Sequence, residues 1–308
     1  MPPLRIVFMG TARFAVPALE RLVGNGFAIP AVVTGPDRPR GRGRELSPTP
    51  VKEAASGSGL NVLQPERLKD AAFAEAIRSL GPDLIVVVAF RILPPEVFRI
   101  PRLGSINLHA SLLPRYRGAA PINRAIMNGE VETGVTTFFL EESVDTGNIL
   151  LQARTPILPD DDAGTLHDRL ADVGAEILLH TVRLVEQGKA VPRPQDPSQA
   201  SPAPKIFKED CRIDWHAPAE NVRNHIRGLS PHPAAFTTHG GRVLKLFRAH
   251  IVAGSLPPGT VDIMKDSLFV GTADDPLAID DLQQEGKKRM TAPEFLRGYR
   301  ISSGDLFE

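Results

Sequence analysis

Apolar runs of strand length alternate with amphipathic stretches along the first half of the chain. The runs are rich in β-branched residues, which is typical of strands buried on both faces of a parallel sheet. We predict strands at Leu4–Met9, Ala31–Thr34, Asp83–Ala89, Ser105–Ala110 and Val135–Leu140. Helices are predicted at Phe14–Val23, Ala71–Ser79, Ala119–Met127 and from Leu166 to a stop at Gly188. The alternation predicts an α/β domain built on a parallel sheet.

The pattern changes near residue 190. Five prolines fall within residues 191–204 among Gln, Ser and Asp, a composition that favours an extended connector. One helical stretch, Ala219–Leu229, then precedes short strand-like runs, at Ala235–Thr238, Val243–Ala249, Thr260–Ile263, Leu268–Val270 and Leu277–Leu282. Short strands separated by Gly and Asp turns predict a small β-barrel or sandwich. We therefore expect a first domain at 1–189, a linker at 190–207 and a second domain at 208–308.

Charge and cysteine content narrow the class of protein. The 308 residues carry 36 Lys plus Arg and 36 Asp plus Glu, a balance that argues against binding nucleic acid through general basicity. The one cysteine, Cys211, excludes an internal disulfide and a multi-cysteine metal site. There is no signal-peptide pattern, and the longest apolar stretch, Leu84–Phe90, is far too short to cross a membrane. We expect a soluble cytoplasmic protein that uses no metal.

Three polar residues share one face at the end of the predicted strand Ser105–Ala110. Alternation places Asn107, His109 and Ser111 on one side and apolar residues on the other. The carboxyl ends of strands in open parallel sheets are where such sheets bind ligands. Asn107 and His109 are about 6.5 Å apart along the strand, which leaves room for a small carbonyl group between their side chains. An Asn amide suits a developing oxyanion, and His is a proton shuttle near neutral pH.

A carboxylate that would complete this set lies in the loop after the strand Val135–Leu140. There, Asp145 would orient the second ring nitrogen of His109. The same residues also fit a half-buried histidine with satisfied hydrogen bonds and an aspartate that caps a turn, so the pattern alone leaves two readings open. A nucleophilic role for Ser111 is disfavoured, because the tight Gly-x-Ser-x-Gly elbow is missing.

The segment Asn107–Ile122, with Asp145–Gly147 downstream, resembles the formyltransferases that use 10-formyltetrahydrofolate. Within that family the resemblance is to the enzymes that act on methionyl-tRNA, and it covers nearly the whole chain. Shorter matches lie at Gly10–Ala15, Gly35–Pro39, Gly41–Gly43, Ser47–Lys52, Ile213–Trp215, Ile226–Pro231 and Leu282–Lys288. The resemblance implies a Rossmann-like catalytic domain followed by an OB-like β-barrel domain that binds tRNA.

The resemblance also implies a reaction. The formyl group of 10-formyltetrahydrofolate, a co-substrate, would pass to the α-amino group of initiator methionyl-tRNA, giving N-formylmethionyl-tRNA for translation initiation. Asn107 would stabilise the oxyanion, His109 would move the proton and Asp145 would hold His109. The folate would lie against Ser111, Leu112, Leu113, Pro114, Phe90 and Ile92. The loop 89–94 is one residue shorter than the family pattern, which leaves the pterin pocket's shape open. The partners implied are this tRNA and the folate, with no membrane, and we expect a monomer.

A run of arginines lies between the second predicted strand and the next element. Residues 36–50 contain Arg38, Arg40, Arg42 and Arg44 with almost no apolar residue among them. Arginine suits bidentate phosphate contact, and connections of this length are often functional. The same composition also fits a solvated surface loop that binds nothing. In the family it inserts at the acceptor stem of the tRNA, and Arg42 is the matching position.

Two rival functions remain open at the level of sequence. Another folate-dependent formyltransferase or hydrolase, acting on a sugar amine, a purine precursor or water, would share the residues Asn107, His109 and Asp145. A nucleotide-binding regulator or RNA-binding module without catalysis is the other rival. The arginine loop and the second domain favour a tRNA acceptor over a small one. We expect Trp215 to pack at the domain junction.

Overall fold

The computed structural model describes residues 3–40 and 45–308, and the chain forms two compact units. The first unit contains the chain up to Gly118, together with Gly134–Thr155 and His167–Pro202. The second contains Ala119–Thr133, Pro156–Leu166 and Ala203–Glu308. The domain limits expected from the sequence, with a linker at 190–207, stay a prediction, because compactness does not show which piece folds independently.

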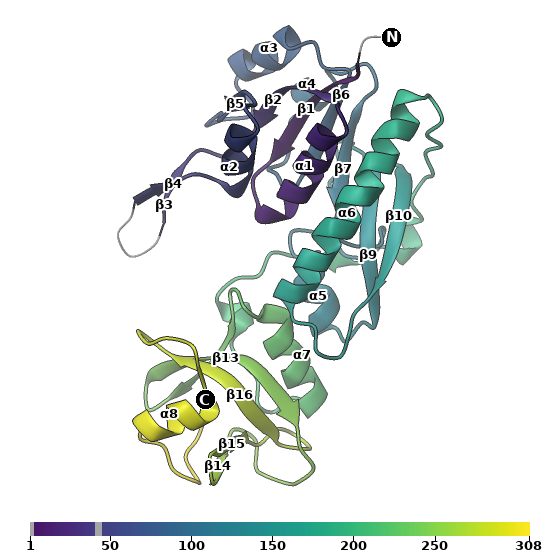
Figure 1. Cartoon of the computed structure of the whole chain (residues 1–308). Coiled ribbons are helices and arrows are strands. Elements are labelled where there is room, and N and C mark those ends of the chain that lie inside the picture. The colour runs from purple at the N-terminus through teal and green to yellow at the C-terminus, as the bar shows by residue number, and fades with distance from the viewer. Residues whose placement is uncertain (1–2, 41–44) are drawn as a thin grey trace. The chain divides into compact units, whose positions relative to one another are not determined.

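Seven strands form the sheet of the first unit, in the order β10-β9-β7-β6-β1-β2-β5 (Figure 1). Their bounds are β1 Arg5–Gly10, β2 Ala28–Val33, β5 Val62–Leu63, β6 Leu84–Val88, β7 Ser105–His109, β9 Glu132–Phe139 and β10 Ile149–Pro156. Neighbours from β5 to β7 are parallel, which confirms the expected α/β class. The prediction of a parallel strand is wrong at β9, which runs antiparallel to β7. Because β9 is antiparallel to β7 and starts near the end of β7, where His109 pairs with Thr136, the chain between β7 and β9 does not have to cross the sheet.

Helices cover both faces of this sheet, with bounds α1 Val16–Gly24, α2 Pro50–Gly57, α3 Ala71–Ser79, α4 Pro95–Phe98 and α6 Ala163–Glu186. On one face α1 and α6 lie side by side (Figure 1), joined by an ion pair between Arg21 and Glu176. On the other face α3 and α4 pack against a cluster that includes Val87 of β6. Asn107 of β7 pairs in register with Val87, so Asn107 and His109 project on the α3 and α4 side.

The second unit is built on an antiparallel sheet in the order β12-β13-β16-β15-β14, with β17 paired to β16. Its elements are α5 Pro121–Met127, α7 Ala219–Leu229, β12 Ala235–His239, β13 Arg242–Ile251, β14 Val261–Met264, β15 Ser267–Val270, β16 Leu277–Gln284, β17 Met290–Thr291 and α8 Ala292–Gly298. The expected C-terminal β-domain is thus confirmed. Across residues 45–308 no ladder joins β12 to β14, so closure into an OB-like barrel stays a prediction.

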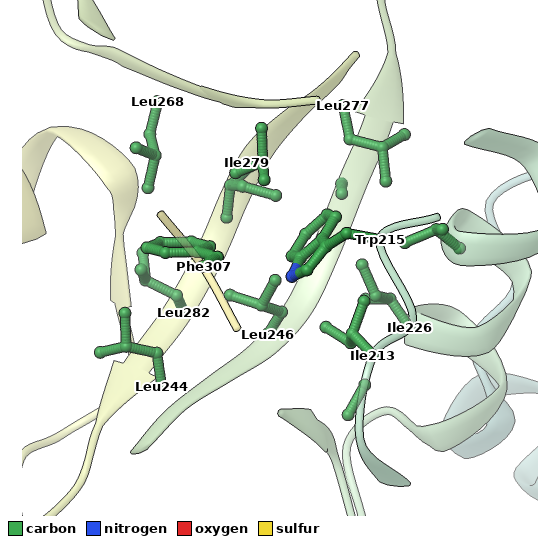
Figure 2. Close-up of a cluster of buried hydrophobic side chains, with 14 of the residues drawn as sticks. Ile213, Trp215, Ile226, Leu244, Leu246, Leu268, Leu277, Ile279, Leu282 and Phe307 are labelled. Atoms are coloured by element: carbon green, nitrogen blue, oxygen red, sulfur yellow. The ribbon is translucent and has the colours of Figure 1, made fainter. Parts of the chain in front are cut away.

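Trp215 belongs to the core of the second unit (Figure 2). Its ring centroid is 6.1 Å from that of Phe307, and its Nε1 donates a 3.0 Å hydrogen bond to Thr237 Oγ1. The expectation that Trp215 packs at the domain junction is therefore wrong. The aliphatic cluster inside this unit accommodates the indole, and Thr237 satisfies its one polar atom.

The arginine segment contains a short hairpin rather than the loop expected at 36–50. Strand β3 (Arg38–Arg40) pairs antiparallel with β4 (Glu45–Ser47). Neither strand has an apolar alternation, so the hydrophobic pattern could not predict them. The remaining strands are the two-residue β8 (Arg117–Gly118) and β11 (Pro202–Ala203). No helix in the described part of the chain is long and apolar enough to cross a membrane.

Candidate active site

Asn107 lies in the middle of β7 and His109 is its last residue, and both are on the same face of the sheet. Asn107 is half-buried, and within the described residues its side-chain amide has no protein hydrogen-bond partner. His109 is 8% exposed. A side-chain donor without a protein partner at this edge of the sheet is free to bind a ligand oxygen.

Both ring nitrogens of His109 face oxygen atoms of the protein. Nε2 lies 2.8 Å from the carbonyl oxygen of Tyr116. Because a carbonyl only accepts, Nε2 is the nitrogen that carries the hydrogen. Nδ1 lies 3.7 Å from Oδ2 of Asp145. Nδ1 is therefore the nitrogen left to take up or release a proton.

Asp145 reaches His109 from the loop between β9 and β10. Its side chain is 10% exposed, and its Oδ2 accepts a 2.8 Å hydrogen bond from the backbone N–H of Gly118. Its backbone adopts a φ of +57°, an uncommon conformation for a residue with a side chain. The reading of Asp145 as the cap of its own turn is not what the structure shows, because the donor is 27 residues away.

The turn after β7 is ordered by its own side chains. Ser111 is fully buried and its Oγ donates to the carbonyl oxygen of Arg115 at 2.6 Å. Leu113 is buried against Phe138, whereas Leu112 and Pro114 are partly exposed. Of the four predicted folate contacts here, Leu112 and Pro114 are the ones that offer side-chain surface. The contacts themselves stay a prediction.

The loop after β6 presents the other two predicted folate contacts. Ile92 is 76% exposed, and Phe90 packs partly against the apolar cluster under α3 and α4. The guanidinium of Arg91 donates to the carbonyl oxygens of Pro65 and Glu66, at 2.8 and 3.0 Å, and lies over the Phe90 ring. These contacts tie the loop to the chain that follows β5. They leave Ile92 with an uncovered apolar surface.

A surface cavity of about 580 Å³ lies beside the loop that carries Asp145. Its lining includes Ser105, Phe98, Arg99, Leu140 and Glu142. Ser105 is the first residue of β7, four positions before His109, so this cavity is at the other end of the strand from His109. The cavity and His109 are thus different places, although the loop that carries Asp145 lies beside both.

The base of the β3–β4 hairpin is held by a charged cluster. Lys52 of α2 and Gln64 both donate hydrogen bonds to the carboxylate of Asp37, and Gln64 also donates to the carbonyl oxygen of Gly35. The Lys52 ammonium, followed by the Gln64 amide, holds the pKa of Asp37 below its usual range. Asp37 directly precedes β3, so this cluster fixes where the hairpin leaves the sheet.

The predicted tRNA-binding arginines are placed only in part. Arg38 is exposed on β3, and Arg40 ends that strand. Arg42 and Arg44 lie outside the described residues. The structure therefore shows the base of the arginine segment, and contact of these four residues with RNA stays a prediction.

Sequence profiles of two domains match the chain. The formyl transferase profile matches residues 4–182, and the profile of the formyl transferase C-terminal domain matches residues 205–300. A methionyl-tRNA formyltransferase of Caldanaerobacter subterraneus subsp. tengcongensis is 48% identical over 99% of this chain and 100% of its own length. The chain belongs to the methionyl-tRNA formyltransferase family. A second member of this family, from Chlorobium luteolum, is 52% identical over 96% of this chain and 97% of its own length.

Solved structures share the fold of this family member. An N-formyltransferase of Helicobacter canadensis, solved with folinic acid and dTDP-3-aminofucose, matches with a TM-score of 0.70 at 19% identity, over 91% of this chain and 99% of that one. HypX of Aquifex aeolicus, in complex with tetrahydrofolic acid, matches with a TM-score of 0.67 at 19% identity. That match covers 99% of this chain and 51% of HypX. At these identities the likeness supports the fold alone.

The structure brings Asn107, His109 and Asp145 together, and it adds two groups that the sequence analysis missed. These are the carbonyl oxygen of Tyr116 and the N–H of Gly118, which bind His109 and Asp145 respectively. Both are backbone atoms, so no residue type could have identified them. The one available signal was that Tyr116 and Gly118 fall within the segment that carries the family resemblance.

Proposed function

We propose that the chain transfers the formyl group of 10-formyltetrahydrofolate to the α-amino group of initiator methionyl-tRNA, giving N-formylmethionyl-tRNA for translation initiation in the cytoplasm. The observation that carries the proposal is the end-to-end match, at about half identity, to curated methionyl-tRNA formyltransferases that include the C-terminal domain. The half-buried Asn107 amide and the His109–Asp145 pair supply groups that suit this reaction.

The reaction joins the methionine nitrogen to the formyl carbon and breaks the bond from that carbon to N10 of the folate. In the tetrahedral intermediate the formyl oxygen carries negative charge, which the Asn107 amide stabilises by donating a hydrogen bond. The amine loses a proton when it attacks, and N10 gains one when it leaves. His109 moves this proton through Nδ1, because Nε2 is committed to the Tyr116 carbonyl oxygen. Asp145 holds the ring and balances its positive charge.

The two substrates use different parts of the chain. Leu112, Pro114, Phe90 and Ile92 offer apolar surface to the pterin, while Ser111 and Leu113 shape the turn from inside. The arginines Arg38, Arg40, Arg42 and Arg44 take the acceptor end of the tRNA through its phosphates. No metal has a step in this scheme, and the protein acts as a monomer. Its domains are 1–189 and 208–308, joined by a linker at 190–207.

A direct test offers the purified protein 10-formyltetrahydrofolate and three acceptors in parallel: initiator methionyl-tRNA, free methionine and a nucleotide-linked amino sugar. We expect formylation of the methionyl-tRNA and almost none of the other two. Formylation of the amino sugar with none of the methionyl-tRNA would contradict the proposal. Arg42→Ala provides a second check, because it should weaken use of the tRNA far more than use of the folate.

A further inference from the structure

The proline-rich segment contains one residue that differs from its neighbours. Every residue from 191 to 200 is exposed except Gln195, which is half-buried. The segment is also anchored by backbone hydrogen bonds in both directions between Arg193 and Ile149, at 2.7 and 2.8 Å. In a connector that is only solvated, a glutamine side chain would be exposed. The half-buried side chain of Gln195 therefore indicates that it contacts the first unit.

All the hydrogen-bonding capacity of the Gln195 side chain is used near the reacting groups. Its Nε2 donates to the carbonyl oxygens of Asp145 and Gly147, at 2.9 and 2.8 Å. Its Oε1 accepts from Nε and a terminal nitrogen of Arg117, at 3.1 and 2.6 Å. One amide thus joins the loop that carries Asp145 to the strap Tyr116–Gly118.

The loop at Asp145 depends on such support. Asp145 has a φ of +57°, which costs free energy for a residue with a side chain. At Gly147 the chain passes so close to β9 that a Cβ would lie 1.7 Å from the carbonyl oxygen of Phe139. A loop held in this way has little freedom, and the two carbonyl oxygens that it turns inward need donors. Gln195 supplies both.

The strap on the other side of Gln195 touches both reacting groups. The Tyr116 carbonyl oxygen accepts from His109 and the Gly118 N–H donates to Asp145, each at 2.8 Å. The proline-rich segment holds the strap a second time through Ser201, whose Oγ and carbonyl oxygen accept from the N–H groups of Tyr116 and Arg117, each at 2.9 Å. Residues 195–201 therefore border the strap and the Asp145 loop together.

We propose that Gln195 is a positioning residue for formyl transfer: it fixes the Asp145 carboxylate relative to Nδ1 of His109 by bonding the backbone of the Asp145 loop and the Arg117 side chain. This inference rests on the proposed function for its kinetic consequence. It assigns the proline-rich segment a part in the active-site framework in addition to its role as a connector. Gln195 itself does not touch the reacting atoms.

The test compares Gln195→Ala and Gln195→Glu with Gln199→Ala as the matched control. Gln199 lies in the same segment and is exposed, and among the described residues its side chain bonds Asp196 alone. Gln195→Glu can still accept from Arg117 but places a carboxylate against the two carbonyl oxygens. Misplacing a catalytic group by about an ångström costs up to about 100-fold in rate, so we expect kcat to fall about 10- to 100-fold in both Gln195 variants. The KM values for both substrates should stay within about twofold, because no substrate contact is removed.

Nitrogen NMR of the histidine side chains supplies a readout that needs no substrate. In wild type and Gln199→Ala, the Nδ1 signal of His109 should report the same carboxylate neighbour, and it should shift in both Gln195 variants. Wild-type kcat and an unchanged Nδ1 signal in Gln195→Ala would overturn the inference. So would wild-type kcat in Gln195→Glu, because the donated hydrogen bonds would then be dispensable. Failure of the wild type to formylate methionyl-tRNA would instead overturn the proposed function, while the Nδ1 comparison would still decide the role of Gln195.

Discussion

Replacement of Asn107 by alanine isolates the contribution of one hydrogen-bond donor to the reaction. Asn107 lies in the middle of β7, with its backbone paired to Val87 on one side and Phe138 on the other. Its amide has no protein partner in the described residues, so Asn107→Ala leaves no group unsatisfied. We therefore expect the free energy of unfolding to change by less than about 1 kcal/mol. The change should affect chemistry and not the fold.

The expected kinetic effect follows from the role of the amide in the tetrahedral intermediate. Removal of one oxyanion donor lowers kcat by about 10²- to 10³-fold, which corresponds to about 2.7–4 kcal/mol. His109 and Asp145 remain in place for proton transfer, so activity should fall and not vanish. The measurement is steady-state formylation of methionyl-tRNA, with thermal unfolding as the check on folding. The isosteric Asn107→Asp serves as the shape control, because it keeps the volume and replaces the donor by a carboxylate oxygen.

Near-normal kcat in Asn107→Ala would refute this reasoning. Full activity in Asn107→Asp would refute it as well, since that side chain cannot donate when ionised. A rise in KM for the folate with kcat unchanged would reassign Asn107 to binding of the ground state.

Three further predictions concern the Asp145 loop and the arginine hairpin. Gly147→Ala should lower kcat about 100-fold, because the new Cβ would displace the loop. The control Gly298→Ala should have the kcat of the wild type, because nothing lies within 4 Å of its new Cβ. Lys52→Met should destabilise the protein at pH 7 in urea unfolding. The pKa of Asp37 is lowered in the folded protein, so the stability that Asp37 and Lys52 contribute is present at neutral pH and lost on acidification. The difference in free energy of unfolding between wild type and Lys52→Met should therefore disappear below about pH 4. A difference that stays constant with pH would contradict this prediction. Arg42→Ala should raise KM for methionyl-tRNA about tenfold and weaken its salt dependence, with KM for the folate unchanged; equal losses for both substrates would remove Arg42 from the tRNA site.

Some elements could be predicted from sequence because local rules agreed with the fold. The predicted helices Ala71–Ser79 and Ala219–Leu229 have the bounds found in the structure, since apolar periodicity and clear start signals coincide there. Strand β10, Ile149–Pro156, was missed because three of its eight residues are exposed and its polar residues break the apolar run. Helix α2, Pro50–Gly57, was not predicted, because only Val51 and Ala55 of its eight residues are buried, which leaves little apolar periodicity in its sequence.

Part of the candidate site could also be predicted from the sequence, and part could not. Asn107 and His109 were predictable because strand alternation puts them on one polar face, and Asp145 because it follows a neighbouring strand. The groups that hold them were not predictable: a carbonyl oxygen, a backbone N–H, and an amide 50 residues from Asp145 in the sequence. Backbone atoms have no residue type, and contacts between distant segments depend on the folded chain. The sequence therefore predicted which side chains come together at this site, and it did not predict the groups that hold them in place.

Formyl transfer to methionyl-tRNA is measured most directly by following a labelled formyl carbon from 10-formyltetrahydrofolate. After reaction with initiator methionyl-tRNA, the ester to the tRNA is hydrolysed and the released amino acid is analysed for label. We expect labelled N-formylmethionine with the wild type and at least about 100-fold less with Asn107→Ala in the same time. Label recovered as formate, or on another acceptor with none on methionine, would contradict it.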